Sequence, residues 1–164
     1  MPRLEQVRTE HARAILAFER ANRAYFASWI SDRGEEYFEQ FPARHRELLA
    51  EQAAGKSAFY VLVDGDGEVL GRFNLYDIER GAAKVGYRVA QRVAGRGLAT
   101  TSVRQLCEIA KSLGVGALTA ATSHENVASQ KVLKKAGFEP DGPAGPSELG
   151  GKEGVCYRRD LTAT

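Results

Sequence analysis

The stretch Gly95-Arg96-Gly97-Leu98-Ala99-Thr100 says more about the fold than any other part of this chain. It follows a strand-like run, residues 85–89, and precedes a run of helical periodicity that starts near Thr100. Glycines lack a Cβ, so they let the backbone turn tightly and bring successive N–H groups against an anion. The N-terminus of the following helix adds about half a positive charge. The stretch therefore predicts a loop that binds a pyrophosphate, with an ordinary strand-to-helix turn as the alternative.

The size and charge of the chain narrow its class. Its 164 residues, 43% of them hydrophobic, suit one globular domain over residues 1–164. The 23 basic residues nearly balance the 21 acidic ones, and the net charge of +2 disfavours binding to nucleic acid or anionic lipid. No apolar run approaches the length of a membrane span, and the N-terminal sequence lacks the apolar core of a signal peptide. We therefore expect a cytoplasmic protein without a membrane partner.

The two cysteines, Cys107 and Cys156, lie far apart and lack the spacing of a metal site. Neither a disulfide framework nor a bound metal is indicated. Both thiols are expected to be buried and unreactive.

Hydrophobic periodicity predicts a mixture of helices and strands. Residues 10–30 predict two short helices with a bend near Asn22, and residues 35–54 an amphipathic helix with Pro42 near its start or at a bend. Strands are expected at residues 58–63, 68–76, 82–89, 117–122 and 155–161, and further helices at 100–113 and 127–136. A turn at residues 64–67 joins the first two strands in a hairpin, and the Gly- and Pro-rich segment 142–154 is expected to be a mobile loop.

Two more segments complete a pattern around the glycine loop. Asn126-Val127-Ala128-Ser129 and Lys135-Ala136-Gly137-Phe138 begin and end a predicted helix after the fourth strand. Together with the glycine loop and the order of elements, they resemble the GCN5-related N-acetyltransferase (GNAT) family over nearly the whole chain. The resemblance implies an α/β (α+β) GNAT fold, with a mixed, mostly antiparallel central sheet flanked by helices. Residues 22–29, taken with Asn126 and Ser129, are similar to the branch of the ribosomal-protein-alanine N-acetyltransferases.

The resemblance implies acetyl-CoA as acetyl donor and no other cofactor. The implied coenzyme-binding residues are Val89, Ala94, Gly95, Arg96, Gly97, Leu98, Ala99, Thr100, Asn126 and Ser129. The family loop usually opens with Gln or Arg, where this chain has Ala94; Arg92 would open the same pattern two residues earlier, but too close to the strand end. Because backbone N–H groups do most of the binding, Ala94 bears on coenzyme affinity more than on activity.

The resemblance also implies direct attack by an amine in a ternary complex, with a backbone N–H near Val89 stabilising the oxyanion. The leaving thiolate needs a proton donor. Family members often carry a Tyr one turn before the Gly-Phe pair, but this chain has Leu133 there. Ser129, one turn after Asn126 on the same helix face, is the candidate donor or a pantetheine ligand; bonding to its own helix backbone is the alternative.

Two other positions and one group of aromatic residues keep two interpretations each. Asn126 is expected to bond the pantetheine amides rather than cap the helix, although both fit. Tyr87 either lines the coenzyme tunnel or packs in the core. The aromatic residues of the N-terminal helices suit the core better than an acceptor-site wall; they are Tyr25, Phe26, Trp29, Tyr37 and Phe38.

The acceptor amine is mostly protonated at neutral pH, so a base must remove its proton. Glu148 is the candidate, because the resemblance places a glutamate directed at the acceptor in the stretch after Gly137-Phe138. A solvated loop carboxylate is the alternative. His124 competes for the role, since an ordinary histidine pKa of about 6.5 suits a general base.

These observations predict an N-acetyltransferase that moves the acetyl group of acetyl-CoA to a primary amine, with a protein N-terminal amine preferred as acceptor. A small-molecule amine acetyltransferase is one alternative. A non-catalytic acyl-CoA-binding module is another alternative. It is suggested by Ala94 and Leu133, which replace the polar side chains that the family usually carries at these positions. Homodimers are common in such families, so a second copy of the chain is left open as a partner.

Overall fold

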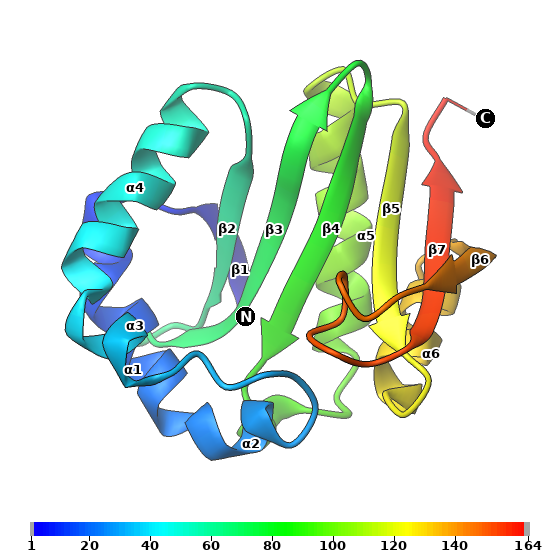
Figure 1. The fold of residues 1–164 in the computed structure, drawn as a ribbon. Helices are drawn as coiled ribbons and strands as arrows, with labels where there is room; N and C mark the ends of the chain where they lie inside the picture. The colour runs from blue at the N-terminus through cyan, green and yellow to red at the C-terminus, as the bar shows by residue number, and fades with distance from the viewer. Residues whose placement is uncertain (1, 163–164) are drawn as a thin grey trace.

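The structure, a computed structural model, describes residues 2–162, and a seven-stranded sheet forms its centre (Figure 1). The strands are β1 (Arg3–Gln6), β2 (Ala58–Val63), β3 (Val69–Glu79), β4 (Ala82–Val89), β5 (Ala117–Ser123), β6 (Glu139–Ala144) and β7 (Gly154–Asp160). They lie in the order β1-β2-β3-β4-β5-β7-β6. The β4–β5 pair is parallel and the other pairs are antiparallel. This arrangement confirms the predicted mixed, mostly antiparallel sheet.

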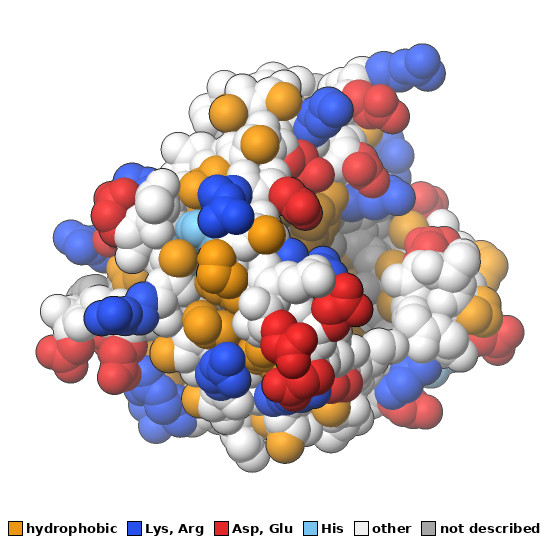
Figure 2. Space-filling view, turned by 60° about the vertical axis from the view of Figure 1, so that its left-hand side comes forward, with side chains coloured by type: hydrophobic (Ala, Val, Ile, Leu, Met, Phe, Trp, Pro, Cys, Tyr) orange, Lys and Arg blue, Asp and Glu red, His pale blue; other side chains and the backbone are white. Residues whose placement is uncertain are grey.

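Helices flank the sheet. They are the 3-10 turns η1 (Thr9–His11) and η2 (Gln91–Val93) and the helices α1 (Ala12–Ala21), α2 (Arg23–Ala27), α3 (Glu35–Glu39), α4 (Phe41–Ala53), α5 (Leu98–Ser112) and α6 (Val127–Lys135). Figure 1 shows α5 behind the strands and α2 below the tip of β4. On the face that carries α1 to α4, basic and acidic side chains are interspersed with apolar ones (Figure 2). Within residues 2–162, no helix combines the length and the hydrophobicity needed to cross a membrane.

Most of the predicted elements are confirmed. The bend in residues 10–30 falls at Asn22, between α1 and α2. The amphipathic stretch 35–54 is divided at Gln40 into α3 and α4, and Pro42 lies in the first turn of α4, where its missing N–H costs no hydrogen bond. The strands β2 and β4 have the predicted bounds, and α5 begins at Leu98, two residues before the predicted start.

The prediction of a mobile loop over residues 142–154 is partly wrong, because its first residues belong to β6 and its last residue begins β7. The β6 sequence, EPDGPA, gives no strand signal. It pairs at the edge of the sheet with an irregularity between Pro140 and Pro143, where a proline breaks no internal ladder. The short edge strand β1 was likewise not predicted.

The feature that positions the site is the divergence of β4 and β5. These strands pair only where residues 82–84 meet residues 117–119. Beyond Lys84, β4 continues through Val89 while still paired with β3, so its other edge is unpaired toward β5. The parallel pair therefore opens into a gap just before the glycine loop.

Candidate active site

Two cavities of about 340 Å³ each meet at the gap between β4 and β5. One, the loop cavity, is bordered by the glycine loop and the start of α5. The other, the strand cavity, is bordered by residues 120–123 of β5 and residues 148–150. Both cavities share Trp29, Ile30, Tyr87, Arg88, Asn126 and Ser129. A ligand that fills the loop cavity can therefore present a reactive group to a second ligand in the strand cavity.

The glycine loop has a backbone geometry that suits an anion cradle. Gly95 and Gly97 have φ values of 79° and 78°, in the left-handed region that favours glycine. Gly97 is the N-cap of α5 and no side chain caps this helix, so backbone N–H groups of its first turn are open to an anion. Ala94, Gly95 and residues 97–100 border the loop cavity, whereas the exposed Arg96 is not among its lining residues. The geometry fits the pyrophosphate of a coenzyme.

The register of the loop follows from Arg92. Its guanidinium forms an ion pair with Glu68 at 2.9 Å, and Arg92 borders neither cavity. Ala94 does border the loop cavity, with a methyl group where the family carries a long polar side chain. The geometry thus favours the later register.

A backbone donor faces the gap at the end of β4. Ala90 N donates to Leu70 O at 2.8 Å, which makes this a hydrogen-bonded pair of the antiparallel ladder. Because such pairs alternate, the preceding pair, Val89 with Gly71, directs the Val89 N–H away from β3. Past Lys84 no β5 pairing meets that side of β4, so the Val89 N–H is directed into the gap.

Asn126 and Ser129 hold the start of α6 at the junction of the cavities. Asn126 Oδ1 accepts from Ser129 N at 3.1 Å, so Asn126 does cap the helix, the role ranked second from the sequence. The capping bond uses the amide oxygen and leaves Nδ2 as the group that a pantetheine carbonyl would meet. Both residues border both cavities.

Tyr87 is the residue that sequence reasoning left unassigned. Its Oη lies 3.0 Å from Ser129 Oγ, at the junction of the two cavities. Its ring stacks on Phe73, with centroids 5.6 Å apart. Burial raises the pKa of Tyr87 to about 12, against a smaller opposing effect of the bond to Ser129. The phenol therefore stays protonated at neutral pH; the only sequence signal was its position on the strand before the loop.

The two candidate bases lie in different surroundings. Glu148 borders the strand cavity together with Tyr87 and Ser129, although its side chain is exposed. His124 is exposed and lines neither cavity. Its backbone N donates to Glu153 O at 3.2 Å, in the connection between β5 and α6. The structure thus brings Glu148, and not His124, to the cavity shared with Ser129.

Most of the aromatic residues follow the expected core placement. Phe26, Tyr37 and Phe38 are buried in the core, although Phe26 also borders the loop cavity, as does Tyr25. Trp29 is the member of the group that borders both cavities. Of the thiols, Cys107 is buried as predicted and Cys156 is half-buried. Burial raises the pKa of both thiols, in keeping with low reactivity.

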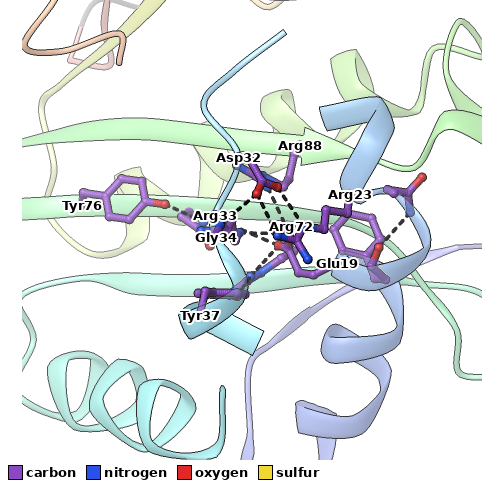
Figure 3. Close-up of polar contacts among 12 residues, drawn as sticks. Glu19, Arg23, Asp32, Arg33, Gly34, Tyr37, Arg72, Tyr76 and Arg88 are labelled. Atoms are coloured by element: carbon purple, nitrogen blue, oxygen red, sulfur yellow. Dashed lines mark hydrogen bonds and ion pairs between the residues drawn. The ribbon is translucent and has the colours of Figure 1, made fainter. Parts of the chain in front are cut away.

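A buried carboxylate that contacts Arg88, a residue bordering both cavities, was not predicted at all. Glu19, on α1, is 1% exposed and contacts three guanidinium groups (Figure 3). Arg33 binds both of its oxygens, at 3.0 and 3.1 Å, Arg72 binds at 2.7 Å and Arg88 at 3.0 Å. Burial alone would raise the pKa of Glu19, but the bond from Arg33 and the charges of Arg72 and Arg88 lower it below its usual value. These residues come from segments far apart in the sequence, so periodicity gave no signal for their meeting.

Comparison with known proteins adds the family. Residues 3–139 match the family described as acetyltransferase (GNAT) domain. The chain is 28% identical over 136 residues to a protein of Bacillus subtilis named "Probable N-acetyltransferase YjcK", covering 79% of this chain and 75% of that protein.

Two solved structures share the fold. The ribosomal-protein-S5-alanine acetyltransferase of Vibrio fischeri superposes with a TM-score of 0.89 at 22% identity, covering 98% of this chain and 93% of that one. RimJ of Mycobacterium smegmatis, solved with CoA-disulfide, gives a TM-score of 0.84 at 23% identity, covering 96% of this chain and 80% of that one. The family match spans the glycine loop and the junction at Tyr87 and Ser129, and we conclude that the chain belongs to the GNAT family and is an N-acetyltransferase that uses acetyl-CoA as its donor.

Proposed function

We propose that residues 1–164 act as one catalytic domain that acetylates a protein N-terminal amine by direct attack in a ternary complex. The observation that carries this proposal is the meeting of two cavities at the Tyr87–Ser129 pair, because direct transfer needs donor and acceptor to share one reaction point. The similarity of residues 22–29 to the ribosomal-protein-alanine branch supports the choice of acceptor. So does the shape shared with the Vibrio fischeri enzyme.

The glycine loop and the first turn of α5 bind the coenzyme's pyrophosphate in this proposal, and Asn126 Nδ2 holds the pantetheine. Bound acetyl-CoA supplies an activated acetyl group. The Val89 N–H donates to the acetyl carbonyl oxygen as negative charge develops there. Ala94 removes one side-chain contact from this cradle and leaves its backbone donors in place.

Proton transfers are assigned to side chains at the junction and in the strand cavity. Glu148 accepts a proton from the acceptor ammonium, directly or through water, so that the neutral amine can attack. Ser129 Oγ–H gives its proton to the departing thiolate and takes one back from the positively charged nitrogen of the tetrahedral intermediate, so the serine ends neutral. Tyr87 Oη–H donates to Ser129 Oγ and so directs the serine proton away from itself and toward the coenzyme. Tyr87 is a positioning residue, because its raised pKa keeps it a donor throughout.

One observation favours a second candidate, the acetylation of a small primary amine. Two contacts join opposite walls of the strand cavity: Ser31 Oγ donates to Gly150 O at 3.3 Å, and Lys152 Nζ donates to Trp29 O at 3.0 Å. A cavity closed on that side admits a compact amine more readily than a peptide chain. The N-terminal acceptor requires these contacts to open.

Release of free coenzyme A from acetyl-CoA, measured with separate pools of N-terminal peptides and of small primary amines, tests the proposal. We expect faster release with the peptide pool. Release with small amines alone would select the second candidate. No release with either pool would leave a coenzyme-binding module and would refute the catalytic assignment.

A further inference from the structure

The cluster of Glu19, Arg33, Arg72 and Arg88 carries more positive than negative charge. One carboxylate faces three guanidinium groups, so the cluster has a formal charge of +2. The side chains of Arg72 and Arg88 are 8% and 16% exposed. Charge removed from water is costly unless it is paired, so an anion that approached this cluster would be bound favourably.

Arg88 is the member of the cluster that borders both cavities. Nη1 donates to Glu19 Oε1 at 3.0 Å, and the guanidinium lies 4.7 Å from the ring centre of Phe26. Within residues 2–162, Nη1 is the one nitrogen of this side chain with a hydrogen-bond acceptor, so the Nε and Nη2 donors remain for a ligand. Glu19 and Phe26 fix the plane of the guanidinium. Its Nε and Nη2 donors form a fork whose geometry matches the two oxygens of a carboxylate.

The sheet places this fork on the side opposite to Tyr87. Successive residues of a strand point to opposite faces, so Arg88 projects with its register partner Arg72 toward Glu19 of α1, while Tyr87 stacks with its partner Phe73. Both side chains nevertheless reach the gap, because β4 is unpaired there on its β5 side. A ligand in the strand cavity can therefore meet Tyr87 and Ser129 at one point and Arg88 at another.

The strand cavity also holds charges of its own. Lys152 is paired with Glu125 at 3.2 Å, and Glu148 supplies a carboxylate. The cavity thus combines one anionic group, suited to an ammonium, with the cationic fork of Arg88. This arrangement fits a zwitterion better than a polyamine, whose second and third positive charges the arginine cluster would repel.

We propose that Arg88 selects acceptors in which a carboxylate lies within a few bonds of the amine. This inference rests on the proposed function and narrows its substrate class. The carboxylate can belong to a free amino acid or to an acidic residue at the start of a peptide, and both sources present the same group to the guanidinium.

Matched acceptors test the proposal and separate the two sources. Initial rates are compared for alanine against alaninamide, and for C-terminally amidated peptides that begin with alanine followed by glutamate or by glutamine; spermidine serves as a cationic acceptor. We expect kcat/KM to favour the anionic member of at least one pair by about 10- to 100-fold, the range of a charge-assisted hydrogen bond. Spermidine should be the poorest acceptor. A wild-type enzyme that shows no preference for either anionic member, or that prefers spermidine, would overturn the inference while leaving acetyltransfer intact.

Two variants assign the preference to Arg88. Arg88→Gln keeps an N–H donor for Glu19 and removes the charge, so the preference should fall to within about 3-fold of unity. Arg33→Gln is the matched control, because Arg33 binds the same carboxylate but borders neither the loop cavity nor the strand cavity. It should keep the wild-type preference. A preference that survives Arg88→Gln, or that is lost equally in both variants, contradicts the assignment.

A binding measurement gives a readout that does not depend on turnover. Trp29 is the chain's single tryptophan and borders both cavities, so its fluorescence should report occupancy. Two pairs of acetylated products are compared with coenzyme A present: N-acetylalanine against its amide, and the amidated peptides that begin with N-acetylalanine followed by glutamate or by glutamine. In at least one pair the anionic member should bind more tightly in the wild type, and the two members should bind equally in Arg88→Gln. Equal binding within both pairs in the wild type would refute the carboxylate site even if no amine were acetylated, which distinguishes this failure from that of the proposed function.

Discussion

A serine hydroxyl is a weak acid, so the case for Ser129 as a proton donor depends on its surroundings. Tyr87 lies 3.0 Å from it and is held protonated by burial, with a pKa raised to about 12. A phenol in that state can donate to Ser129 Oγ and leave the serine proton free to point at the coenzyme sulfur. At the scale of single residues, we therefore propose that Tyr87 and Ser129 act as a pair.

Removing either hydroxyl of the Tyr87–Ser129 pair should slow turnover without weakening coenzyme binding. Ser129→Ala is expected to lower kcat about 10- to 1000-fold, by analogy with typical general-acid contributions, and Tyr87→Phe about 10-fold. Because Tyr87 acts through Ser129, the double variant should be no slower than Ser129→Ala alone. Steady-state kinetics of the three variants, with coenzyme affinity from Trp29 fluorescence, check this. Losses that multiply in the double variant would show that the two hydroxyls act separately.

The base assignment makes a prediction about pH. Glu148→Gln keeps the shape of the side chain and removes its capacity to accept a proton. Its rate should be low at neutral pH and recover partly at high pH, where the free amine is supplied by solvent. His124→Gln is the control and should follow the wild-type profile. The assignment would be reversed if His124→Gln lost activity at neutral pH and regained it at high pH while Glu148→Gln followed the wild-type profile.

At the scale of elements, we propose that coenzyme binding depends on the N-terminus of α5. Gly97→Val places a β-branched side chain at a φ of 78° and against the approaching coenzyme. Acetyl-CoA should raise the Tm of the wild type through binding to the folded state and should not raise that of the variant. Thermal unfolding with and without acetyl-CoA measures both.

Gly55→Val is the matched control for backbone strain, since Gly55 also has a positive φ, 76°, and open space for a Cβ, but follows α4 away from both cavities. It should lower Tm and keep the coenzyme-induced rise. An equal rise in Gly97→Val and the wild type would remove the glycine loop from the binding site.

The local sequence pattern was enough to predict elements with clear strand, turn or helix signals. It could not predict elements and site contacts that depend on residues far apart in the sequence. The hairpin could be placed from its β-forming residues and the 64–67 turn, β4 from its position before the glycine loop, and α5 and α6 from helix signals. The edge strand β6 could not, because its prolines and glycine carry turn signals and its pairing with β7 alone makes it a strand. In the site, the glycine loop and Asn126 had local signatures, whereas the Tyr87–Ser129 contact spans 42 residues and the Glu19–Arg88 contact spans 69.

At the scale of the whole molecule, Glu19 joins α1, the segment before α3 and the strands β3 and β4. Glu19→Gln leaves three buried or partly buried arginines without their counterion, so the free energy of unfolding at neutral pH should fall by about 3–5 kcal/mol. Glu35→Gln is the control, because Glu35 pairs with Arg23 at the surface and should contribute less than about 1 kcal/mol. Urea unfolding of the two variants makes the comparison. A Glu19→Gln protein as stable as the control would show that the buried cluster adds no net stability.

The same substitution should change the pH dependence of unfolding. The folded state lowers the pKa of Glu19 from its ordinary value of 4.5, so its contribution is complete above that pH and is lost as the pH falls through the lower, folded pKa. The stability gap between wild type and Glu19→Gln should therefore narrow on acidification below about pH 4.5. A gap that stays constant to lower pH would mean that the carboxylate is not stabilised in its charged form.

Direct transfer between the two cavities is the central claim, and a single-turnover experiment tests it most directly. The enzyme is mixed with acetyl-CoA in the absence of any amine, free coenzyme A is followed by chromatography, and an accepted amine is then added. We predict no release before the amine is added and release together with acetylated product afterwards, because the amine itself attacks the acetyl group. A burst of coenzyme A equal to the enzyme concentration without amine would show an acetylated enzyme and contradict the account.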